Sequence, residues 1–146
     1  MALTYFKPLP GRFGVALNTE IGQYPATIAN TATTTIGIGN AYGPQYFNRA
    51  SIAAFVLPTS ASACTVQIFK WDSINSAAVA LTATQDVLVT SQTAKVAFPI
   101  AAIATLTDAQ RTLHSGDYLY AQFVAAGTMT GQATGGVVAC ELYALA

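Results

Sequence analysis

The stretch His114-Ser115-Gly116-Asp117-Tyr118-Leu119-Tyr120-Ala121-Gln122-Phe123-Val124 decides how this chain folds. Its Gly-Asp pair suits a turn, and an alternating run follows it. Successive side chains of a strand point to opposite faces, so one face of this run is apolar and the other carries two phenols and an amide. Such a run is typical of a central strand in an antiparallel sandwich. The two sets are Leu119, Ala121 and Phe123 on one face, and Tyr118, Tyr120, Gln122 and Val124 on the other.

The composition is unusually poor in charge for a chain of one-domain length. The 146 residues include 8% charged and 53% hydrophobic residues, and six Lys and Arg balance six Asp and Glu. A soluble domain normally carries about 25% charged residues. This deficit predicts that neighbouring subunits cover much of the surface. The alternative is a neutral surface made of Thr, Ser, Asn and Gln, which are plentiful here.

The charge pattern argues against nucleic acid, and the apolar pattern argues against a membrane. Phosphate binding needs clustered cations, whereas here they occur singly, as Lys7, Arg12, Arg49, Lys70, Lys95 and Arg111. The first residues lack the basic start and apolar run of a secretory signal. Two long uncharged spans, 50–69 and 118–140, alternate and contain Pro, Gly or polar residues, so they predict strands rather than membrane spans.

Residues 1–22 predict an extended N-terminal arm, and residues 23–146 a single β-sandwich domain. Pro and Gly punctuate the arm, yet it holds more large apolar residues than a solvated tail does. We expect it to dock on its own domain or on a neighbour, the alternative being a flexible terminus. The candidate interface residues are Tyr5, Phe6, Leu9, Phe13, Val15 and Leu17.

Seven or eight short strands separated by turns follow the arm. No amphipathic helix and no βαβ repeat interrupts them, although 106–113 has room for one helical turn capped by Thr107 or Asp108. The pattern predicts an all-β fold, an antiparallel β-sandwich of jelly-roll-like type. The expected strands are 26–39, 46–57, 64–71, 79–82, 94–100, 118–124 and 137–145, with 84–91 ambiguous.

Nothing in the sequence predicts catalysis, a cofactor or a metal site. His114, Ser115 and Asp117 are crowded into one turn, where they cannot easily form a relay, so we interpret them as a polar turn. His114 is the single histidine, and no two carboxylates show general acid/base spacing. Cys64 and Cys140 each lie in a β-like run and are predicted to be buried thiols, with a disulfide as the alternative.

The aromatic residues allow two interpretations. Aromatic rings can stack on sugars, but they also fill small β cores and interfaces, where Tyr and Trp are enriched. We favour the second interpretation and keep the first open. The residues concerned are Trp71, Tyr42, Tyr46, Tyr118, Tyr120 and Tyr143.

Over residues 46–143 the chain resembles the small β-sandwich or jelly-roll virion proteins of tailed bacteriophages, above all the head-decoration (cement) proteins. The front third, rich in Thr and Gly, matches no such pattern. The resemblance lies in the order of short motifs: the apolar strand 50–57, then Thr65-Val66-Gln67-Ile68-Phe69-Lys70, Ala80-Leu81-Thr82, Leu106-Thr107-Asp108 and Ser115-Gly116-Asp117-Tyr118-Leu119.

The resemblance implies a non-enzymatic protein that binds the outside of a phage capsid and clamps neighbouring major capsid subunits. It implies a homo-oligomer, a trimer being favoured, made in the host cytoplasm and located on the outer capsid surface of the virion. The alternative is a fibre, spike or tail-tip module that recognises a host surface glycan. Neither function calls for a cofactor, a nucleic acid or a membrane.

Overall fold

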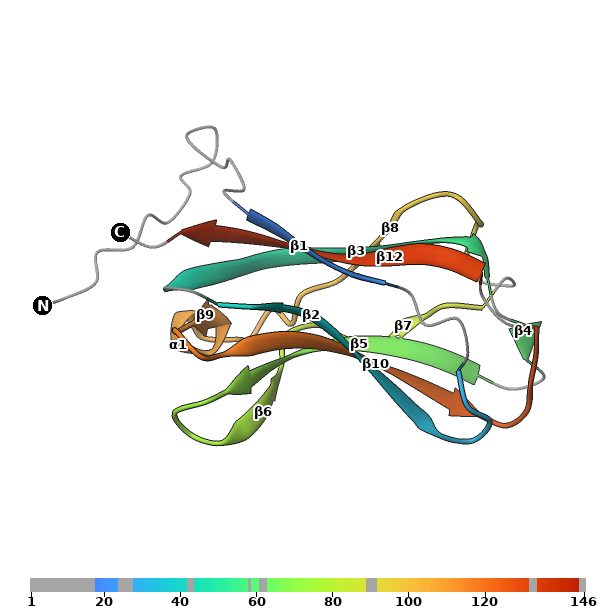
Figure 1. Ribbon diagram of the computed structural model, residues 1–146, viewed down its shortest axis with the longest axis horizontal. Helices are drawn as coiled ribbons and strands as arrows, with labels where there is room; N and C mark the ends of the chain where they lie inside the picture. Colours follow the sequence, from blue (N-terminus) through green and yellow to red (C-terminus); the bar gives the residue numbers. More distant parts are fainter. Residues whose placement is uncertain are drawn as a thin grey trace, which may run out of the picture.

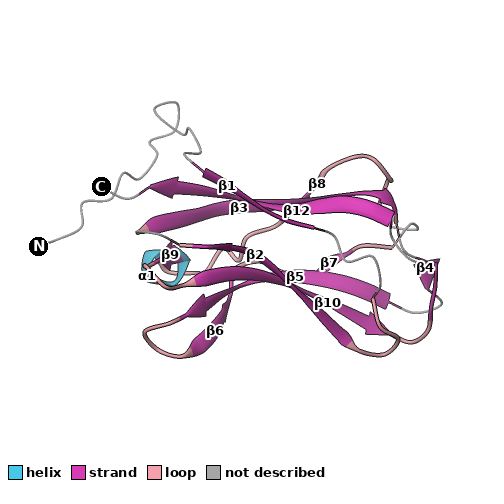
Figure 2. Ribbon diagram, viewed as in Figure 1, coloured by secondary structure: helices cyan, strands magenta, loops and turns pink. Residues whose placement is uncertain are grey.

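The computed structural model describes residues 18–23, 28–41, 44–57, 59–60, 63–88, 92–131 and 134–144. Within them the chain forms two five-stranded antiparallel sheets that face each other (Figures 1 and 2). Sheet B has the order β1-β12-β3-β8 with β9 beside β3, and sheet C the order β2-β10-β5-β6 with β7 beside β5. The all-β, antiparallel sandwich predicted from the sequence is therefore confirmed.

Ten strands make up the two sheets, more than the seven or eight expected, and eight of these ten set the topology. The remaining four of the described strands are two or three residues long. The eight are β1 (Asn18–Gln23), β2 (Thr33–Asn40), β3 (Gln45–Val56), β5 (Ala63–Asp72), β6 (Ala77–Ala80), β8 (Phe98–Ile100), β10 (Tyr118–Ala126) and β12 (Thr134–Ala144). The short ones are β4 (Thr59–Ser60), β7 (Gln85–Asp86), β9 (Thr112–Leu113) and β11 (Met129–Gly131), with β4 and β11 paired outside the two sheets.

The pairing of the eight main strands follows the jelly-roll plan. The first of them pairs with the last (β1 with β12), the second with the second last (β2 with β10), then β3 with β8 and β5 with β6. This is one long hairpin rolled up, and the pairs β3–β12 and β5–β10 close the roll. The topology belongs to the double-sheet jelly-roll class, in which two Greek keys form a sandwich.

Strand β10 lies in the middle of sheet C, as its alternation predicts, with β2 on one side and β5 on the other. Leu119, Ala121 and Phe123 point inward and are buried. They contact residues of sheet B in one core. Burial of the apolar face of β10 therefore stabilises the packing of the two sheets against each other. The core also contains Phe47, Ile52, Val66, Ile68, Ile100, Val138, Cys140 and Leu142.

Several boundaries differ from the expectation. The strands expected at 26–39 and 94–100 begin later, as β2 at Thr33 and β8 at Phe98, and the boundary between the arm and the domain also moves. Residues 18–22, assigned to the arm, belong to β1, which pairs with β12 from Asn18 opposite Leu142 to Gln23 opposite Val137. The six residues Asn-Thr-Glu-Ile-Gly-Gln carry one large apolar side chain and so show no alternation. Backbone pairing with β12 makes this segment a strand, and only the neighbouring strand supplies that.

The predicted helical turn is present as α1 (Asp108–Arg111). Thr107 is its N-cap: the Thr107 hydroxyl accepts from the Gln110 amide, and the Gln110 side chain accepts from the Thr107 amide. This reciprocal pair satisfies backbone groups that the first turn leaves open. No helix in the described residues is long and apolar enough to cross a membrane.

Two glycines differ in the space that the structure leaves for a side chain, and this difference gives a test of the β3–β12 pairing. Gly136 has φ +133°, and a Cβ built there meets the Ala53 carbonyl oxygen and lies 2.8 Å from the Ala54 Cα, whereas a Cβ at Gly37 meets nothing within 4 Å. We expect Gly136→Ala to lower the free energy of unfolding by about 2–4 kcal/mol.

The matched control is Gly37→Ala, which we expect to leave stability unchanged or to raise it by about 0.5 kcal/mol. Urea unfolding followed by tryptophan fluorescence measures both variants. Equal stabilities for the two would contradict the close approach of β12 to β3.

Candidate functional site

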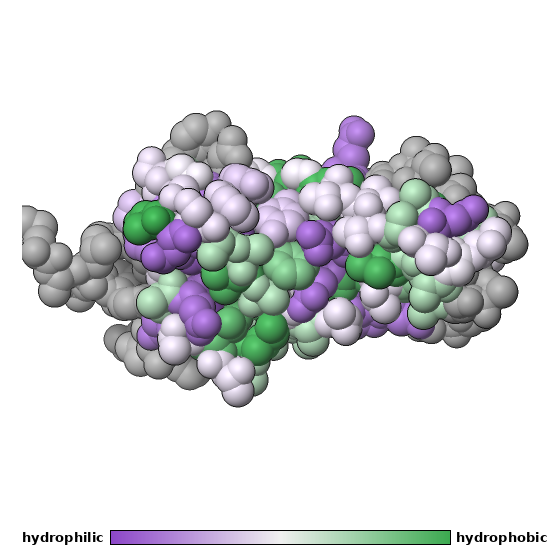
Figure 3. Space-filling model, turned by 90° about the horizontal axis from the view of Figure 1, so that it is seen from below, coloured by the Kyte–Doolittle hydropathy of each residue, from purple (hydrophilic) through white to green (hydrophobic). Residues whose placement is uncertain are grey.

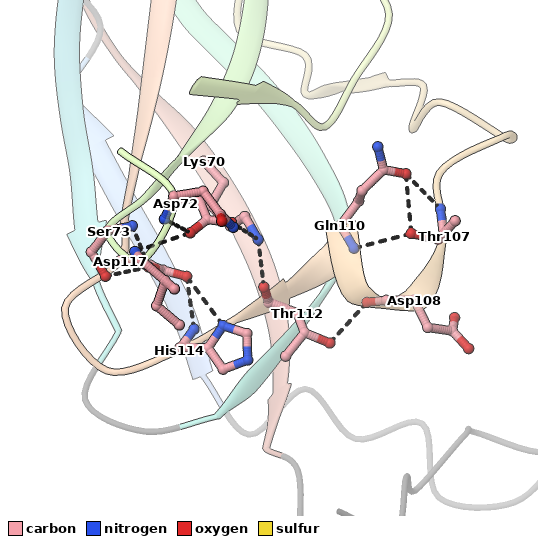
Figure 4. A network of polar contacts seen from close by, with 11 residues as sticks. Lys70, Asp72, Ser73, Thr107, Asp108, Gln110, Thr112, His114 and Asp117 are labelled. Atoms are coloured by element: carbon pink, nitrogen blue, oxygen red, sulfur yellow. Dashed lines mark hydrogen bonds and ion pairs between the residues drawn. The ribbon is translucent and has the colours of Figure 1, made fainter. Parts of the chain in front are cut away.

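The predicted polar turn forms part of a cluster with a buried centre, here called the polar corner and made of Lys70, Asp72, Ser73, Thr112, His114 and Asp117 (Figure 4). Lys70, Thr112 and Asp117 are buried, whereas Ser73 is exposed. The Asp117 side chain is 0% exposed. Its Oδ1 accepts from the Ser73 amide (2.9 Å) and the Ser73 hydroxyl (2.8 Å), and its Oδ2 accepts from the His114 amide (2.8 Å). One carboxylate thus joins the β5–β6 turn to the β9–β10 turn.

Backbone bonds bring a third segment to the same corner. The Asp117 carbonyl accepts from the Ala41 amide at 2.9 Å, just after β2, and the Gly116 amide donates back to the Ala41 carbonyl at 3.3 Å. Gly116 has φ +95°, a conformation that suits glycine. The Gly-Asp pair therefore fixes where β2, β5 and β10 end or begin relative to one another.

A buried lysine completes the corner. Lys70 is 1% exposed, and its Nζ donates to the Thr112 carbonyl at 2.7 Å and lies 3.8 Å from the Asp72 carboxylate. Asp72 in turn accepts from the Ile74 and Asn75 amides, which closes the β5–β6 turn. A buried ammonium is tolerated only when it is paired and hydrogen-bonded, as it is here.

The geometry of the polar corner does not form a nucleophile relay. A relay needs a serine hydroxyl bonded to a histidine nitrogen that an acid orients. Here the Ser73 hydroxyl donates to the acid itself, His114 Nδ1 lies 3.7 Å from Asp117 Oδ2 without a hydrogen-bond partner among the described residues, and Ser115 is exposed. We interpret the corner as a structural joint. Among the described residues, no three His, Cys, Asp or Glu side chains lie together in a way that could hold a metal ion.

Aromatic side chains gather on the outer surface of sheet C, opposite the core, in an aromatic row formed by Phe69, Trp71, Tyr118 and Tyr120. Phe69 stacks on Tyr120 (ring centroids 5.4 Å apart, planes at 13°), and Trp71 stacks on Tyr118 (6.2 Å, 21°). Each pair is a cross-strand pair of β5 and β10. Because the rings pack against one another, Tyr120 is only 8% exposed although it points away from the core.

The outer surface of sheet B has a polar half, centred on Glu141. Arg49 donates to Glu141 Oε2 through Nε (3.0 Å) and Nη2 (2.8 Å), and Asn48 donates to Glu141 Oε1 (2.6 Å) and to the Tyr143 hydroxyl (2.9 Å). Burial raises the pKa of Glu141, but the bonds from Arg49, Asn48 and Tyr143 outweigh it and leave this pKa below its ordinary value. The carboxylate is thus held charged and paired.

The other half of that surface is apolar and hollowed. An open hollow of about 310 Å³ is lined by Ala53, Ala54, Lys95, Gly136 and Val137. Large exposed side chains on β12, on β1 and in the loop before β8 are Val137 (41%), Ile21 (57%) and Val96 (53%). Small residues on β3 and β12 leave the depression, and Val137 borders it; Val96 directly follows Lys95 of the lining, and Ile21 pairs with Ala139 on the neighbouring strand β12. Such an apolar patch marks a contact surface.

The structure separates the aromatic residues singled out from the sequence. Trp71, Tyr118 and Tyr120 meet on sheet C, whereas Tyr46 and Tyr143 pair on the outer side of sheet B. Tyr42 and the six arm residues, Tyr5, Phe6, Leu9, Phe13, Val15 and Leu17, lie outside the described residues. Sequence reasoning missed the hollow, because small residues on two distant strands carry no local signal.

Asp117 gives the first stability prediction. Burial raises the pKa of Asp117, yet the bonds from the His114 and Ser73 amides and the Ser73 hydroxyl, with the nearby Lys70 charge, hold it below its ordinary value. A lowered folded-state pKa stabilises the fold above the unfolded-state pKa of about 3.9, and this contribution is lost as the pH falls below it. We expect Asp117→Asn to cost about 2–3 kcal/mol at pH 7 and less at pH 3.

Urea unfolding at both pH values measures this loss. Ser115→Ala, a change of an exposed hydroxyl in the same turn, is the matched control and should change stability by less than about 0.5 kcal/mol. A loss for Asp117→Asn that is independent of pH would contradict a charged, hydrogen-bonded carboxylate.

The two cysteines give a second prediction. Both are free and buried, Cys64 on β5 and Cys140 on β12. Burial raises the pKa of Cys64 to about 11, with the Asp86 charge adding to it, and burial together with Glu20 raises that of Cys140 to about 12. Since the thiolate is the nucleophile, we expect neither thiol to react with iodoacetamide at pH 8 in the folded protein.

Intact-mass measurement counts the added groups. In urea both thiols should be alkylated, which serves as the positive control. Rapid labelling of the folded protein would show that one of the two strands opens readily.

Comparison with known proteins adds no relative: no family model matches the chain, and neither a curated protein nor a solved structure matches it significantly.

Proposed function

We propose that this protein is a non-enzymatic virion structural protein that binds the outside of a phage capsid and clamps neighbouring major capsid subunits. The jelly-roll topology supports the proposal, because viral capsid domains are among those that use it. Fold alone does not decide function, since lectin domains share the same architecture. We therefore use the outer surface of sheet C to choose between capsid binding and glycan binding.

The observation that carries the proposal is an extended surface with little charge, bordered by Asp86 on the short strand β7. The three long strands of sheet C project only uncharged side chains outward, in a face about nine strand positions long on β10. Figure 3, seen from the side of this sheet, shows apolar and weakly polar areas with smaller hydrophilic ones between them. The outward residues are Thr33, Thr35, Gly37, Thr65, Gln67, Phe69, Trp71, Tyr118, Tyr120, Gln122 and Val124.

This surface suits contact with another protein. Interfaces are depleted in charge at their centre and enriched in Tyr and Trp, and here two tyrosines and a tryptophan lie at one end of the face. The stacked rings hold their positions before binding, so less side-chain freedom is lost when a partner covers them. When the same contact is repeated at many sites on a shell, a modest affinity per contact gives a high overall avidity. The partner we propose is the major capsid protein, on the outer capsid surface.

The aromatic row gives less support to the glycan-binding alternative. A sugar needs a ring face that is open to solvent, but Phe69 and Tyr120 cover each other, as do Trp71 and Tyr118. Tyr118 also tilts against Tyr120 at 44° with centroids 5.7 Å apart, so Tyr120 lies between two rings and is only 8% exposed, whereas Tyr118 is 39% exposed. We therefore assign these rings to packing within sheet C and to contact with a protein.

Co-sedimentation with assembled capsid shells of the phage that carries this protein tests the proposal. We expect saturable binding to shells and a loss of affinity of about tenfold or more for Val124→Asp, which places a charge on the face of sheet C. Ile74→Asp is the control, because Ile74 is 70% exposed in the β5–β6 turn, away from the face. Its binding should match that of the wild type.

Failure of the wild-type protein to bind shells would overturn the capsid proposal. In that case a glycan array with Trp71→Ala as the comparison tests the alternative. Binding of a glycan that is lost in this variant would favour a receptor-binding role, and binding to neither would exclude both.

A further inference from the structure

A second contact surface lies on the opposite sheet, and it calls for a different occupant. The apolar half of sheet B consists of the hollow between β3 and β12 and the exposed side chains beside it. Its floor is made of Ala53, Ala54 and Gly136, and only Lys95 brings a charge to its rim. A depression of this size with an apolar lining accepts a large apolar side chain rather than a charged one.

The position of β1 connects this surface to the N-terminal arm. β1 is the edge strand of sheet B, and it begins at Asn18, opposite Leu142, and ends at Gln23, opposite Val137 beside the hollow. Figure 1 shows β1 starting next to the arrowhead of β12. The chain thus enters the sheet about 17 Å away from its own hollow and runs towards it. Residues that precede Asn18 would have to reverse direction to reach it.

The arm also has the composition and the length to reach a neighbour. Seventeen residues precede Asn18, and fully extended they span about 56 Å, more than the roughly 40 Å of the twelve-residue strand β3. They contain no acidic residue and eight large apolar side chains, namely Met1, Leu3 and the six predicted interface residues Tyr5, Phe6, Leu9, Phe13, Val15 and Leu17. Burial of such side chains is the main favourable contribution to association.

We propose that residues 1–17 of a second copy of this chain occupy the hollow on sheet B, with an aromatic side chain of the arm seated over Ala53 and Gly136. The contact is heterologous, because the arm of one copy meets the sheet of the next. Such head-to-tail contacts form closed rings when the rotation between copies closes. The inference goes beyond capsid binding, since the ring forms without a capsid.

The molar mass of the full-length protein in solution, measured by light scattering, tests the inference. The wild type should be a multiple of 15.1 kDa at high micromolar concentration. Val137→Asp, which puts a charge at the hollow, and the double variant Phe6→Asp/Phe13→Asp in the arm should each fall to the monomer mass. The dissociation constant should rise by about tenfold or more. Val124→Asp is the matched control: this valine is 44% exposed on β10, against 41% for Val137, and its variant should keep the wild-type mass.

Mixing the two defective proteins distinguishes a neighbour's arm from the chain's own. The Val137→Asp chain retains an intact arm and the arm variant an intact hollow, so a mixture should form a 1:1 complex. Thermal unfolding confirms that each variant is folded. If Val137→Asp is not, Val96→Asp in the loop before β8 takes its place, because Val96 is 53% exposed.

A monomeric wild type, an arm variant that keeps the wild-type mass, or a mixture that stays monomeric would overturn the inference. Shell binding is measured separately, on the opposite sheet. A protein that binds shells but does not self-associate would refute the arm contact alone. A protein that self-associates but does not bind shells would refute the capsid proposal alone.

Discussion

A buried carboxylate at the start of the central strand holds the ends of the jelly roll together. Asp117 accepts bonds from the β5–β6 turn and from its own turn, while its backbone pairs with Ala41 after β2. These three segments belong to the three long strands of sheet C. Because a buried charge without partners is costly, the fold is stable only in an arrangement in which these turns meet at Asp117. The register of β10 against β2 and β5 therefore depends on this residue.

Five of the ten charged residues in the described part of the chain are used in such contacts. Lys70, Asp72 and Asp117 lie at the polar corner, and Arg49 is bound to Glu141 on sheet B. Paired and partly buried charges do little to keep a surface soluble. What remains outside are Thr, Gln and aromatic side chains on one sheet and an apolar hollow on the other. The low charge of the composition thus leaves one surface on each sheet that we propose as a contact surface.

The two surfaces suit different occupants for physical reasons. The face of sheet C is extended and its aromatic rings are already packed, so it matches another broad, rigid protein surface. The apolar half of sheet B is small and concave, so it matches a few large side chains on a narrow segment. A protein that binds its own copies on one sheet and a shell on the other would tie several shell subunits together.

The sequence alone determined the class of fold, the inward face of β10 and a helical turn within 106–113 capped by Thr107 or Asp108, because period-two alternation and capping are local properties. Its Gly-Asp pair also located the turn before β10. Only the tertiary structure decided that residues 18–22 form a strand, since pairing with β12 supplies their hydrogen bonds. It alone brought Ser73 to Asp117, Arg49 to Glu141, and Ala53 to Gly136, which are separated by 44, 92 and 83 positions. No local pattern encodes such contacts. The jelly-roll pairing of strands that are distant in the sequence places these side chains together.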